Sequence, residues 1–330
     1  MKVAVVILNW NGKELLNQFL PSVVQHSHQA TIYIADNAST DDSVNFVKET
    51  FPSVKIIQNK SNDGYAKGYN DALQDLSEDI FVLLNSDVEV TPDWLSPILS
   101  EFEKNSNMVA AQPKILDYKN KEWFEYAGAG GGYIDKYGYP YCRGRIFNTI
   151  EKDEGQYNDI KQIFWATGAC LFVKKNAFKN VGGFDADFFT HQEEIDLCWR
   201  LQAHGGIIKY IGTSTVYHVG GATLAAVNPQ KTFYNFRNSL LCLVKNVKGN
   251  KLWGILFTRM LLDGVASFQF LFQGKMAHFI AVFNAHISFY KLLPIFLKKR
   301  KKHPSFLKYY TIKSIVLQHF IFKKKHFNDL

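Results

Sequence analysis

Short apolar runs alternate with amphipathic segments along the first ninety residues. Four runs rich in branched apolar residues each end in polar residues or glycine, at residues 3–8, 31–35, 55–57 and 80–84. Runs of this kind are typical of strands buried in a parallel sheet. Helical segments separate them at residues 14–24, 41–50 and 69–76. The alternation predicts βαβ units and an open, doubly wound, mostly parallel α/β sheet with helices on both faces.

The pattern returns after a glycine- and tyrosine-rich stretch at residues 128–138. That stretch lacks the strand-to-helix context of a phosphate loop, so we expect a loop or hairpin excursion there. A strand at 171–173, a helix at 194–204 and a strand at 207–211 follow. The periodicity therefore predicts a first domain of residues 1–230, followed by a helical extension of residues 231–330.

Charge is distributed unevenly between these two parts. Residues 250–330 contain 14 Lys and Arg against Asp263 and Asp329, a net charge of +12. Because the net charge of the whole chain is +8, residues 1–249 have a net charge of −4. The sequence contains no nucleic-acid reader motif to use this charge, and we predict no nucleic-acid partner. An anionic membrane surface is the partner that the basic extension favours.

The extension contains no uninterrupted run of the ~18 uncharged apolar residues expected of a spanning helix. Its longest candidate, residues 276–290, includes two histidines and an asparagine. The basic runs 298–302 and 323–325 lie among aromatic and aliphatic residues, which is typical of helices that lie on a membrane. A solvated helical cap with an ordinary basic face is the alternative.

Cysteine spacing and the N-terminus both indicate the cytoplasm. The four cysteines are widely separated and include no C-x-x-C pair, so neither a zinc ribbon nor a disulfide framework is expected. The chain passes from Met1 and Lys2 directly into the first predicted strand, without the cleavage pattern of a signal peptide. We therefore predict a cytoplasmic protein, peripheral on the inner face of the cell membrane.

Acidic residues follow three of the predicted strands: Asp36, Asp63 and Asp87. Ligands of doubly wound sheets bind at the carboxyl ends of strands, although each Asp alone could be an ordinary helix cap. Their surroundings are more specific, reading in order ILNWNG, ADNASTDDS, NDGYAKGYN and LNSDV. This series resembles family 2 glycosyltransferases, particularly their rhamnosyltransferase-like members, over about residues 3–240.

The resemblance implies a GT-A fold in which residues 1–110 bind a nucleotide-sugar donor and residues 111–230 bind the acceptor. Asp36 would accept a hydrogen bond from the N3–H of the base, which favours UDP or dTDP; capping of the helix at 41–50 is the alternative. The other residues implied at the donor are Asn9, Asn11, Asn37, Gly64, Lys67, Asn70, Asn85, Ser86 and Arg237, with Gly68 permitting close backbone approach. Arg237 could equally begin the helical extension.

Asn85-Ser86-Asp87 stands where the family has its Asp-x-Asp metal motif. The resemblance implies Mg²⁺ or Mn²⁺ bound by Asp87, which neutralises charge on the leaving diphosphate. Because an amide is a weaker ligand for a hard cation than a carboxylate, Asp87 would supply most of the protein's charge there. His218 falls where family members often place a metal-proximal histidine, and a structural role for it is the alternative.

The segment from Gly182 to Arg200 resembles the family's Gly-Gly-Phe-Asp sequence and the motif that holds its catalytic base. Here the expected Asp is Glu194, which we predict to deprotonate the attacking acceptor hydroxyl in an inverting displacement, with Glu193 as its substitute. The alternative is a plain helix start, in which the acidic residues stabilise the first turn and Asp196 pairs with Arg200.

Trp165 and Gly168 stand where the resemblance places the acceptor, although Trp165 could equally be core. The function implied is inverting transfer of a rhamnose or another hexose to a saccharide or polyprenyl-linked acceptor in cell-surface polysaccharide synthesis. A degenerate sugar-nucleotide-binding or scaffold protein is an alternative, to which the departures at Asn85 and Glu194 point. A sugar nucleotidyltransferase is disfavoured because Asn9-Trp-Asn-Gly12 is a poor match to its glycine-rich loop. The sequence disfavours a dehydrogenase, since no G-x-G-x-x-G follows the first strand.

Overall fold

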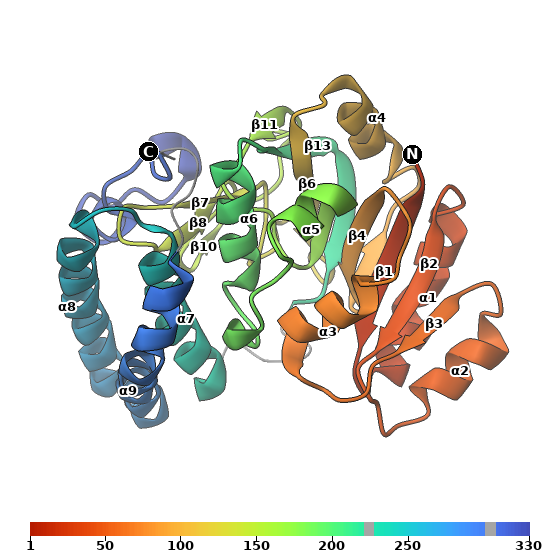
Figure 1. Ribbon diagram of the computed structural model, residues 1–330. Coiled ribbons are helices and arrows are strands. Elements are labelled where there is room, and N and C mark those ends of the chain that lie inside the picture. The colour runs from red at the N-terminus through yellow and green to blue at the C-terminus, as the bar shows by residue number, and fades with distance from the viewer. Residues whose placement is uncertain (221–227, 301–307) are drawn as a thin grey trace.

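A nine-stranded mixed sheet forms the centre of the computed structural model, which describes residues 1–220, 228–300 and 308–330 (Figure 1). Its order is β11-β13-β6-β12-β4-β1-β2-β3, with β5 paired to β13. The strands are β1 Val3–Asn9, β2 Thr31–Asp36, β3 Lys55–Gln58, β4 Ile80–Asn85, β5 Val88–Val90, β6 Met108–Asp117, β11 Ile160–Gln162, β12 Cys170–Lys174 and β13 Ile207–His218. The first four pair in parallel, as the sequence predicts.

Helices cover both faces of this sheet because successive side chains of its strands are apolar and point to opposite faces. Val3, Val5 and Ile7 of β1 share a core with α1, α2 and α4, whereas Ala4 and Val6 share one with α3, α5 and α6. These helices are α1 Lys13–His26, α2 Ser43–Thr50, α3 Gly64–Leu73, α4 Ser96–Lys104, α5 Lys175–Asn180 and α6 Glu193–Ala203, with a 3₁₀ turn at Ala186–Phe188 before α6. The predicted fold class is confirmed.

Two local predictions need correction. The third helix begins at Gly64, five residues before the predicted start, because Gly64 adopts φ +86° and turns the chain directly into α3. Lys67 and Gly68 therefore lie on the first turns of a helix and not in a loop. Strand β3 is half exposed, since it is the edge of the sheet and has a neighbour on one side only.

The glycine-rich excursion forms a small second sheet. Its strands are β7 Gly132–Ile134, β8 Pro140–Cys142, β9 Arg145–Ile146 and β10 Thr149–Ile150, in the order β10-β9-β8-β7. Strands β7 and β8 are antiparallel, which confirms the predicted hairpin. This sheet packs against the C-terminal segment through a core of Tyr141, Ile146 and Ile315.

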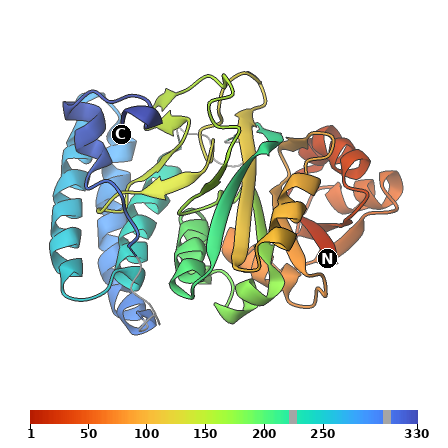
Figure 2. The same ribbon diagram turned by 90° about the horizontal axis from the view of Figure 1, so that it is seen from above.

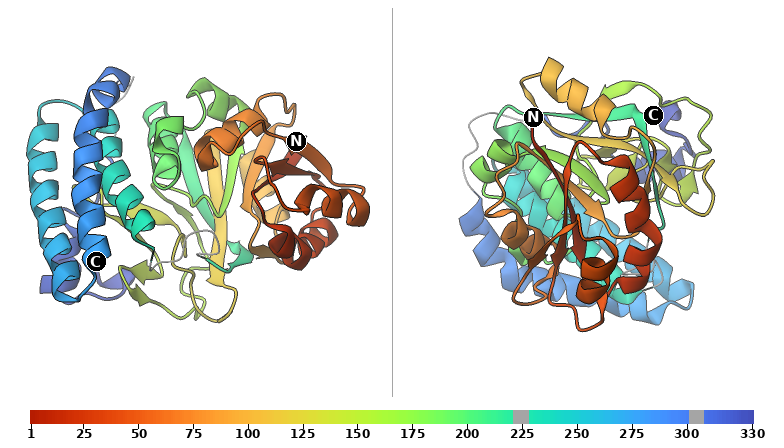
Figure 3. Two further views of the ribbon diagram at one scale, coloured as in Figure 1. Left: turned by 90° about the horizontal axis from the view of Figure 1, so that it is seen from below. Right: turned by 90° about the vertical axis from the view of Figure 1, so that its right-hand side faces the viewer.

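Three long helices follow the sheet: α7 Pro229–Asn246, α8 Lys251–Phe272 and α9 Met276–Lys299. They lie at the end of the molecule opposite β3, with α7 nearest the sheet, as views from above and below show (Figure 2, Figure 3). Leu240 of α7 and Phe289 of α9 belong to the same hydrophobic core as α3 and α6. A π-helical turn at Leu317–Ile321 and a 3₁₀ turn at Phe327–Asp329 complete the described chain.

By length and composition alone, α8 and α9 are each able to cross a bilayer. Neither helix holds an uninterrupted run of 18 uncharged residues, as the sequence predicts, because Arg259 and Asp263 lie within α8 and Lys291 lies within α9. Arg259 and Asp263 pair with each other at 2.7 Å and are buried. Part of the predicted basic run at 298–302 lies outside the described residues. All four cysteines are buried and free, as expected.

Candidate active site

Polar residues from three parallel strands meet at one edge of the sheet. In the β1–β2 ladder Asn9 stands opposite Asp36, and in the β1–β4 ladder Leu8 stands opposite Asn85. The Asn9 amide donates to Oδ1 of Asp36 (3.3 Å), and the backbone N–H of Ser39 donates to Oδ2 (3.1 Å). Asp36 is thereby held as an ordered, buried acceptor at the carboxyl end of β2.

The loop after β1 depends on Asn11 and Gly12. Asn11 adopts φ +50°, and its side-chain carbonyl accepts hydrogen bonds from the backbone N–H groups of Thr40 (2.7 Å) and Asp41 (3.3 Å). A Cβ at Gly12 would lie 2.4 Å from Oδ1 of Asn9, so only glycine leaves room for that side chain. The sequence predicts Asn11 at the donor. In the structure its side-chain carbonyl joins the loop after β1 to the loop after β2.

The side chains of Asn37 and Asn70 also form hydrogen bonds within the protein. Asn37 donates to Oδ1 of Asn62 (2.8 Å) and accepts from Asn59 (3.0 Å). Asn70 donates to the carbonyl of Phe184 and accepts from its N–H, both at 2.9 Å. These hydrogen bonds connect α3 and the loop before it to neighbouring segments. They therefore position the residues around the site.

Two more predicted donor residues lie on the first turns of α3. Lys67 is exposed and pairs with Asp71 at 2.5 Å, and salt bridges of this kind on a surface are weak. A Cβ at Gly64 would lie 2.6 Å from the ring of Phe189, and a Cβ at Gly68 would also meet protein atoms. The two glycines thus allow segments of the protein to pack closely. The prediction gave another reason for these glycines, the close approach of a donor to the backbone.

Asp87 and His218 meet where β4 and β13 end. Nε2 of His218 lies 3.2 Å from Oδ1 of Asp87 and 3.4 Å from the Asn85 amide nitrogen, and both Asp87 and His218 are buried. A carboxylate and an imidazole are ligands that suit Mn²⁺. No group of three or more metal-binding side chains occurs among the described residues, so a cation here would need further ligands from a bound molecule.

Glu125 stands on the other side of the same imidazole, at 3.5 Å from Nδ1. Burial by itself lowers the pKa of His218, but the carboxylates of Glu125 and Asp87 outweigh burial and raise that pKa to about 10. The surroundings of His218 therefore favour positive charge, and a divalent cation would bind the imidazole in place of its proton. Sequence reasoning missed Glu125, because it lies far along the chain from both ligands and outside the segments of the resemblance.

Two carboxyl groups begin α6. Oε2 of Glu193 and Oε2 of Glu194 have no hydrogen-bond partner among the described residues. Burial raises the pKa of Glu194 to about 7, and burial together with the Glu194 charge raises the pKa of Glu193 well above its ordinary range. The predicted pair of Asp196 and Arg200 is confirmed at 2.7 Å. Glu194 therefore has the properties of a proton acceptor, while Asp196 is committed to a salt bridge.

The backbone before α6 is strained. Phe189, His191 and Gln192 adopt φ of +65°, +65° and +72°, a region that side-chain-bearing residues rarely enter. Asn238 of α7 holds this loop, since its amide nitrogen donates to the carbonyls of Thr190 and His191, both at 2.8 Å. Conformations this unfavourable persist only when surrounding contacts fix them.

Arg237 contributes to the same support. Its guanidinium donates to the Phe188 carbonyl (3.2 Å) and to Oδ1 of Asn238 (2.8 Å), and lies over the rings of Phe233 and Tyr234. Of the two predicted roles, binding donor phosphates or belonging to the helix, these contacts favour the second. Asn238 was not singled out as a functional residue because a buried helical asparagine has no distinctive sequence pattern.

Trp165 is packed within the protein. Its ring is 3% exposed, its N–H donates to the Tyr133 carbonyl (3.0 Å), and a Cβ at Gly132 would overlap it. Of its two predicted roles these contacts favour core. Gly168 differs, since its carbonyl accepts from the Tyr65 hydroxyl (2.9 Å), next to the carboxyls of α6.

The thiol of Cys142 is affected by charges from two parts of the candidate site. Burial, and then the charges of Glu125 and Glu194, raise the pKa of Cys142, although the Arg145 guanidinium opposes them. Glu125 contacts His218, which contacts Asp87. Cys142 therefore lies within electrostatic range of both Glu125 and Glu194.

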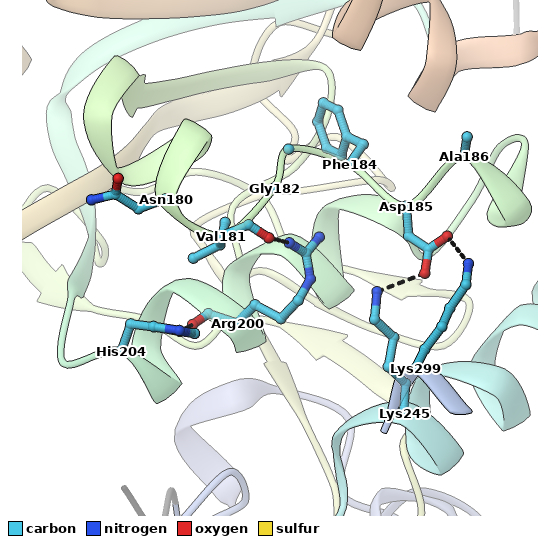
Figure 4. A pocket seen from close by; sticks show the side chains of 11 residues that line it. Asn180, Val181, Gly182, Phe184, Asp185, Ala186, Arg200, His204, Lys245 and Lys299 are labelled. Atoms are coloured by element: carbon cyan, nitrogen blue, oxygen red, sulfur yellow. Dashed lines mark hydrogen bonds and ion pairs between the residues drawn. The ribbon is translucent and has the colours of Figure 1, made fainter. Parts of the chain in front are cut away.

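A separate cavity of about 410 Å³ lies behind the Gly182-Gly-Phe-Asp185 segment (Figure 4). Asp185 reaches into it and pairs with Lys245 at 2.7 Å and with Lys299 at 2.5 Å. Arg200 of α6, Lys245 of α7 and Lys299 of α9 line the cavity together with Asp185, so it lies at the junction of these three helices. The catalytic groups predicted above do not line it.

A family model and a curated relative match the chain. The model of the family described as Glycosyl transferase family 2 matches residues 4–182, more than half of the chain. The chain is 25% identical over 231 residues to the N-acetylglucosaminyl-diphospho-decaprenol L-rhamnosyltransferase of Mycobacterium tuberculosis, which covers 65% of this chain and 75% of that protein.

Two solved structures share the fold. S. aureus TarS 1-349 in complex with UDP-GlcNAc aligns with a TM-score of 0.57 at 14% identity, over 91% of this chain and 84% of that one. The mannosyltransferase PcManGT from Pyrobaculum calidifontis, in complex with GDP-Man and Mn²⁺, aligns with a TM-score of 0.54 at 14% identity, over the same shares. These likenesses confirm the predicted GT-A architecture.

Proposed function

The chain belongs to glycosyl transferase family 2 and transfers a sugar from a nucleotide-sugar donor, and from that premise we propose an inverting, metal-dependent reaction with a lipid-linked saccharide as acceptor. The proposal rests on three carboxylates: Asp36 ends β2 and Asp87 follows β4, the two strands that flank β1, and Glu194 lies on the first turn of α6. One is an ordered acceptor beside β1, one faces a histidine, and one begins α6 with an unpartnered oxygen.

We assign the chemical step to Glu194. Its carboxylate takes the proton of the acceptor hydroxyl as the hydroxyl oxygen forms a bond to the anomeric carbon. The bond from that carbon to the diphosphate breaks on the opposite face, and the nucleoside diphosphate leaves. Glu193 is the second candidate base. Burial and the charge of Glu194 raise the pKa of Glu193 as well.

Asp87 and His218 fit a divalent cation, and we propose that they hold Mn²⁺ or Mg²⁺. When bound, such a cation neutralises charge on the donor diphosphate. Asp36 would accept from the N3–H of a pyrimidine base, which favours UDP or dTDP as the nucleotide. Asn9 keeps the Asp36 carboxylate in place through its amide.

The acceptor proposal rests on similarity and on the C-terminal helices. The mycobacterial relative is named for a decaprenol-linked acceptor, and α8 and α9 are apolar. We propose that residues 1–110 bind the donor, residues 111–230 bind a polyprenyl-linked saccharide, and residues 231–330 hold the enzyme at the inner face of the membrane. The donor sugar would be rhamnose or another hexose for a cell-surface polysaccharide.

Thermal unfolding of the purified full chain with Mn²⁺ and UDP, dTDP or GDP tests the donor site. We expect UDP or dTDP to raise the melting temperature only when the cation is present, and less so in the Asp36→Asn variant. Transfer from the stabilising nucleotide's sugars is then assayed with Glu194→Gln. Donor binding by the wild type without any transfer would favour the alternative of a sugar-nucleotide-binding scaffold.

A further inference from the structure

Between residues 252 and 272, helix α8 buries both of its charged residues and exposes six large apolar ones. Arg259 and Asp263 are 3% and 0% exposed, and Nε of Arg259 lies 2.7 Å from Oδ1 of Asp263. The guanidinium lies 3.8 Å from the centre of the Tyr139 ring, and the Tyr139 hydroxyl donates to Asp263 at 2.9 Å. The polar side of α8 is therefore fixed to the small sheet of the protein.

The opposite side of α8 and the adjoining side of α9 form one apolar surface, which we call the outer face. Its residues recur at helical spacing of three or four and range from 41% exposed at Ile287 to 87% at Phe272: Trp253, Phe257, Leu261, Val265, Phe268 and Phe272 on α8, and Met276, Ile280, Phe283, Ile287 and Tyr290 on α9. Charged residues within 252–290 are the buried pair of α8 and Lys275 at the turn.

This arrangement is the reverse of a water-soluble surface helix, which turns its apolar stripe inward and its charges to solvent. A soluble monomer rarely exposes an apolar patch of this extent. Burying an ion pair has a desolvation cost that does not by itself favour the fold. The pattern is accounted for if the outer face contacts an apolar phase and the ion pair is turned away from it.

Basic residues mark the ends of this surface. Lys251 begins α8, Lys275 is in the turn between the helices, and Lys291 and Lys298 follow the apolar part of α9. Their side chains can reach anionic headgroups while the apolar residues between them meet acyl chains. A second copy of this chain would carry the same positive charge, so a lipid bilayer suits the outer face better.

The outer face is rigidly connected to the catalytic loop through α7. The Thr232 hydroxyl on the first turn of α7 lies 2.8 Å from Nδ1 of His278 on the first turn of α9. Further along α7, Asn238 binds the carbonyls of Thr190 and His191, just before Glu193. In Figure 1 α7 lies between α6 and the α8–α9 hairpin.

We propose that the outer face of the α8–α9 hairpin embeds in one leaflet of a bilayer, with both helices lying along it, and so holds the enzyme at the membrane through α7. The helices lie on the membrane because one side of α8 is buried between Leu252 and Ser267, and one side of α9 is buried between Ala281 and Phe296. The inference rests on the proposed lipid-linked acceptor and specifies how the enzyme would reach it.

Flotation of the full chain with vesicles tests the proposal. Vesicles of phosphatidylcholine alone and of phosphatidylcholine with phosphatidylglycerol are compared, using Phe257→Glu/Val265→Glu and the matched control Trp123→Glu/Ile160→Glu, all four positions being exposed. We expect the wild type and the control to float with both vesicles, more completely with phosphatidylglycerol. The hairpin variant should lose flotation with both.

Flotation of the hairpin variant equal to that of the wild type would overturn the proposal. So would a wild type that stays unbound and forms a dimer that the variant dissociates, because the outer face would then belong to a second copy. Stabilisation by UDP with Mn²⁺ is measured on every variant. It should be unchanged by the hairpin substitutions, so failure of membrane binding is distinguishable from failure of the proposed donor site.

Discussion

Nε2 of His218 lies 3.2 Å from Oδ1 of Asp87, although 131 residues separate the two in the sequence. The contact exists because β13 runs antiparallel to the short strand β5, which follows Asp87 directly and pairs Val88 with His218. The topology of the sheet, and no local sequence pattern, thus brings a carboxylate and an imidazole together at the end of β4.

Replacement of Asp87 tests the cation site. Asp87→Asn removes the charge but keeps the shape, so we expect stabilisation by Mn²⁺ with UDP to disappear and transfer to fall by roughly 10²-fold or more. Asp71→Asn, which changes an exposed carboxylate on α3, is the control and should behave as the wild type. Thermal unfolding with increasing Mn²⁺ reports binding independently of activity.

Glu125→Gln tests whether the second carboxylate orients His218. A carboxylate behind a metal-binding histidine fixes the ring and strengthens it as a ligand, and its loss costs about 10- to 100-fold in metal affinity. We expect weaker Mn²⁺ binding, measured by calorimetry in the presence of UDP. The neighbouring exposed Glu122→Gln should leave the affinity unchanged. Equal affinities for both variants would assign Glu125 a structural role only.

The pH dependence of transfer follows from Glu194. Because burial raises its pKa to about 7, the carboxylate is increasingly protonated below that pH and cannot accept the acceptor's proton. We expect kcat/KM to rise with pH and level off above about 7. Glu194→Gln should lower the plateau by about 10²- to 10⁴-fold and remove this limb. A profile that retains the limb in the variant would transfer the role to Glu193.

The same pKa predicts an effect on stability. The folded protein binds a proton at Glu194 more tightly than the unfolded chain, whose ordinary pKa is 4.5. This contribution is complete below pH 4.5 and is lost as pH rises through about 7. Glu194→Gln should therefore gain stability relative to the wild type between pH 5 and pH 8, on the order of 2 kcal/mol. Urea unfolding at the two pH values measures the difference, which should be absent for the exposed Glu122→Gln.

Asn238→Ala should release the strained loop before α6. The amide nitrogen donates to three carbonyls, at distances of 2.8 to 3.0 Å, and leaving buried carbonyls unpaired costs about 1–3 kcal/mol. We expect lower stability together with a reduced kcat, because Glu193 and Glu194 follow this loop directly. Asn235→Ala, on a less buried side of α7, is the control. A stability loss with unchanged kcat would separate the loop from catalysis.

Much of the fold follows from local pattern. The runs at 3–8 and 80–84 predict β1 and β4 because strands buried on both faces must be continuously apolar. The start of α3 at Gly64 was missed, since a positive-φ glycine can end a loop or begin a helix and its sequence does not distinguish these. The apolar character of α8 was underestimated because a linear count treats Arg259 and Asp263 as exposed charges.

The candidate site follows from sequence less completely. Asp36, Asp87 and the Glu193–Glu194 pair are recognisable from motifs, because each stands in a segment of characteristic spacing. Glu125 and Asn238 are not, since their roles depend on contacts with residues distant in the chain. The sequence also left Trp165 open between an acceptor contact and core, and only the packing of its ring on Gly132 favours core.

The most direct measurement is calorimetric titration of UDP with Mn²⁺ into the wild type, Asp36→Asn, Asp87→Asn and Glu194→Gln, alongside transfer assays on the same preparations. We predict that the two aspartate variants bind UDP at least about tenfold more weakly, the loss expected for one charge-assisted contact. Glu194→Gln should bind as the wild type but fail to transfer. Wild-type binding by Asp87→Asn together with undiminished transfer by Glu194→Gln would contradict the account.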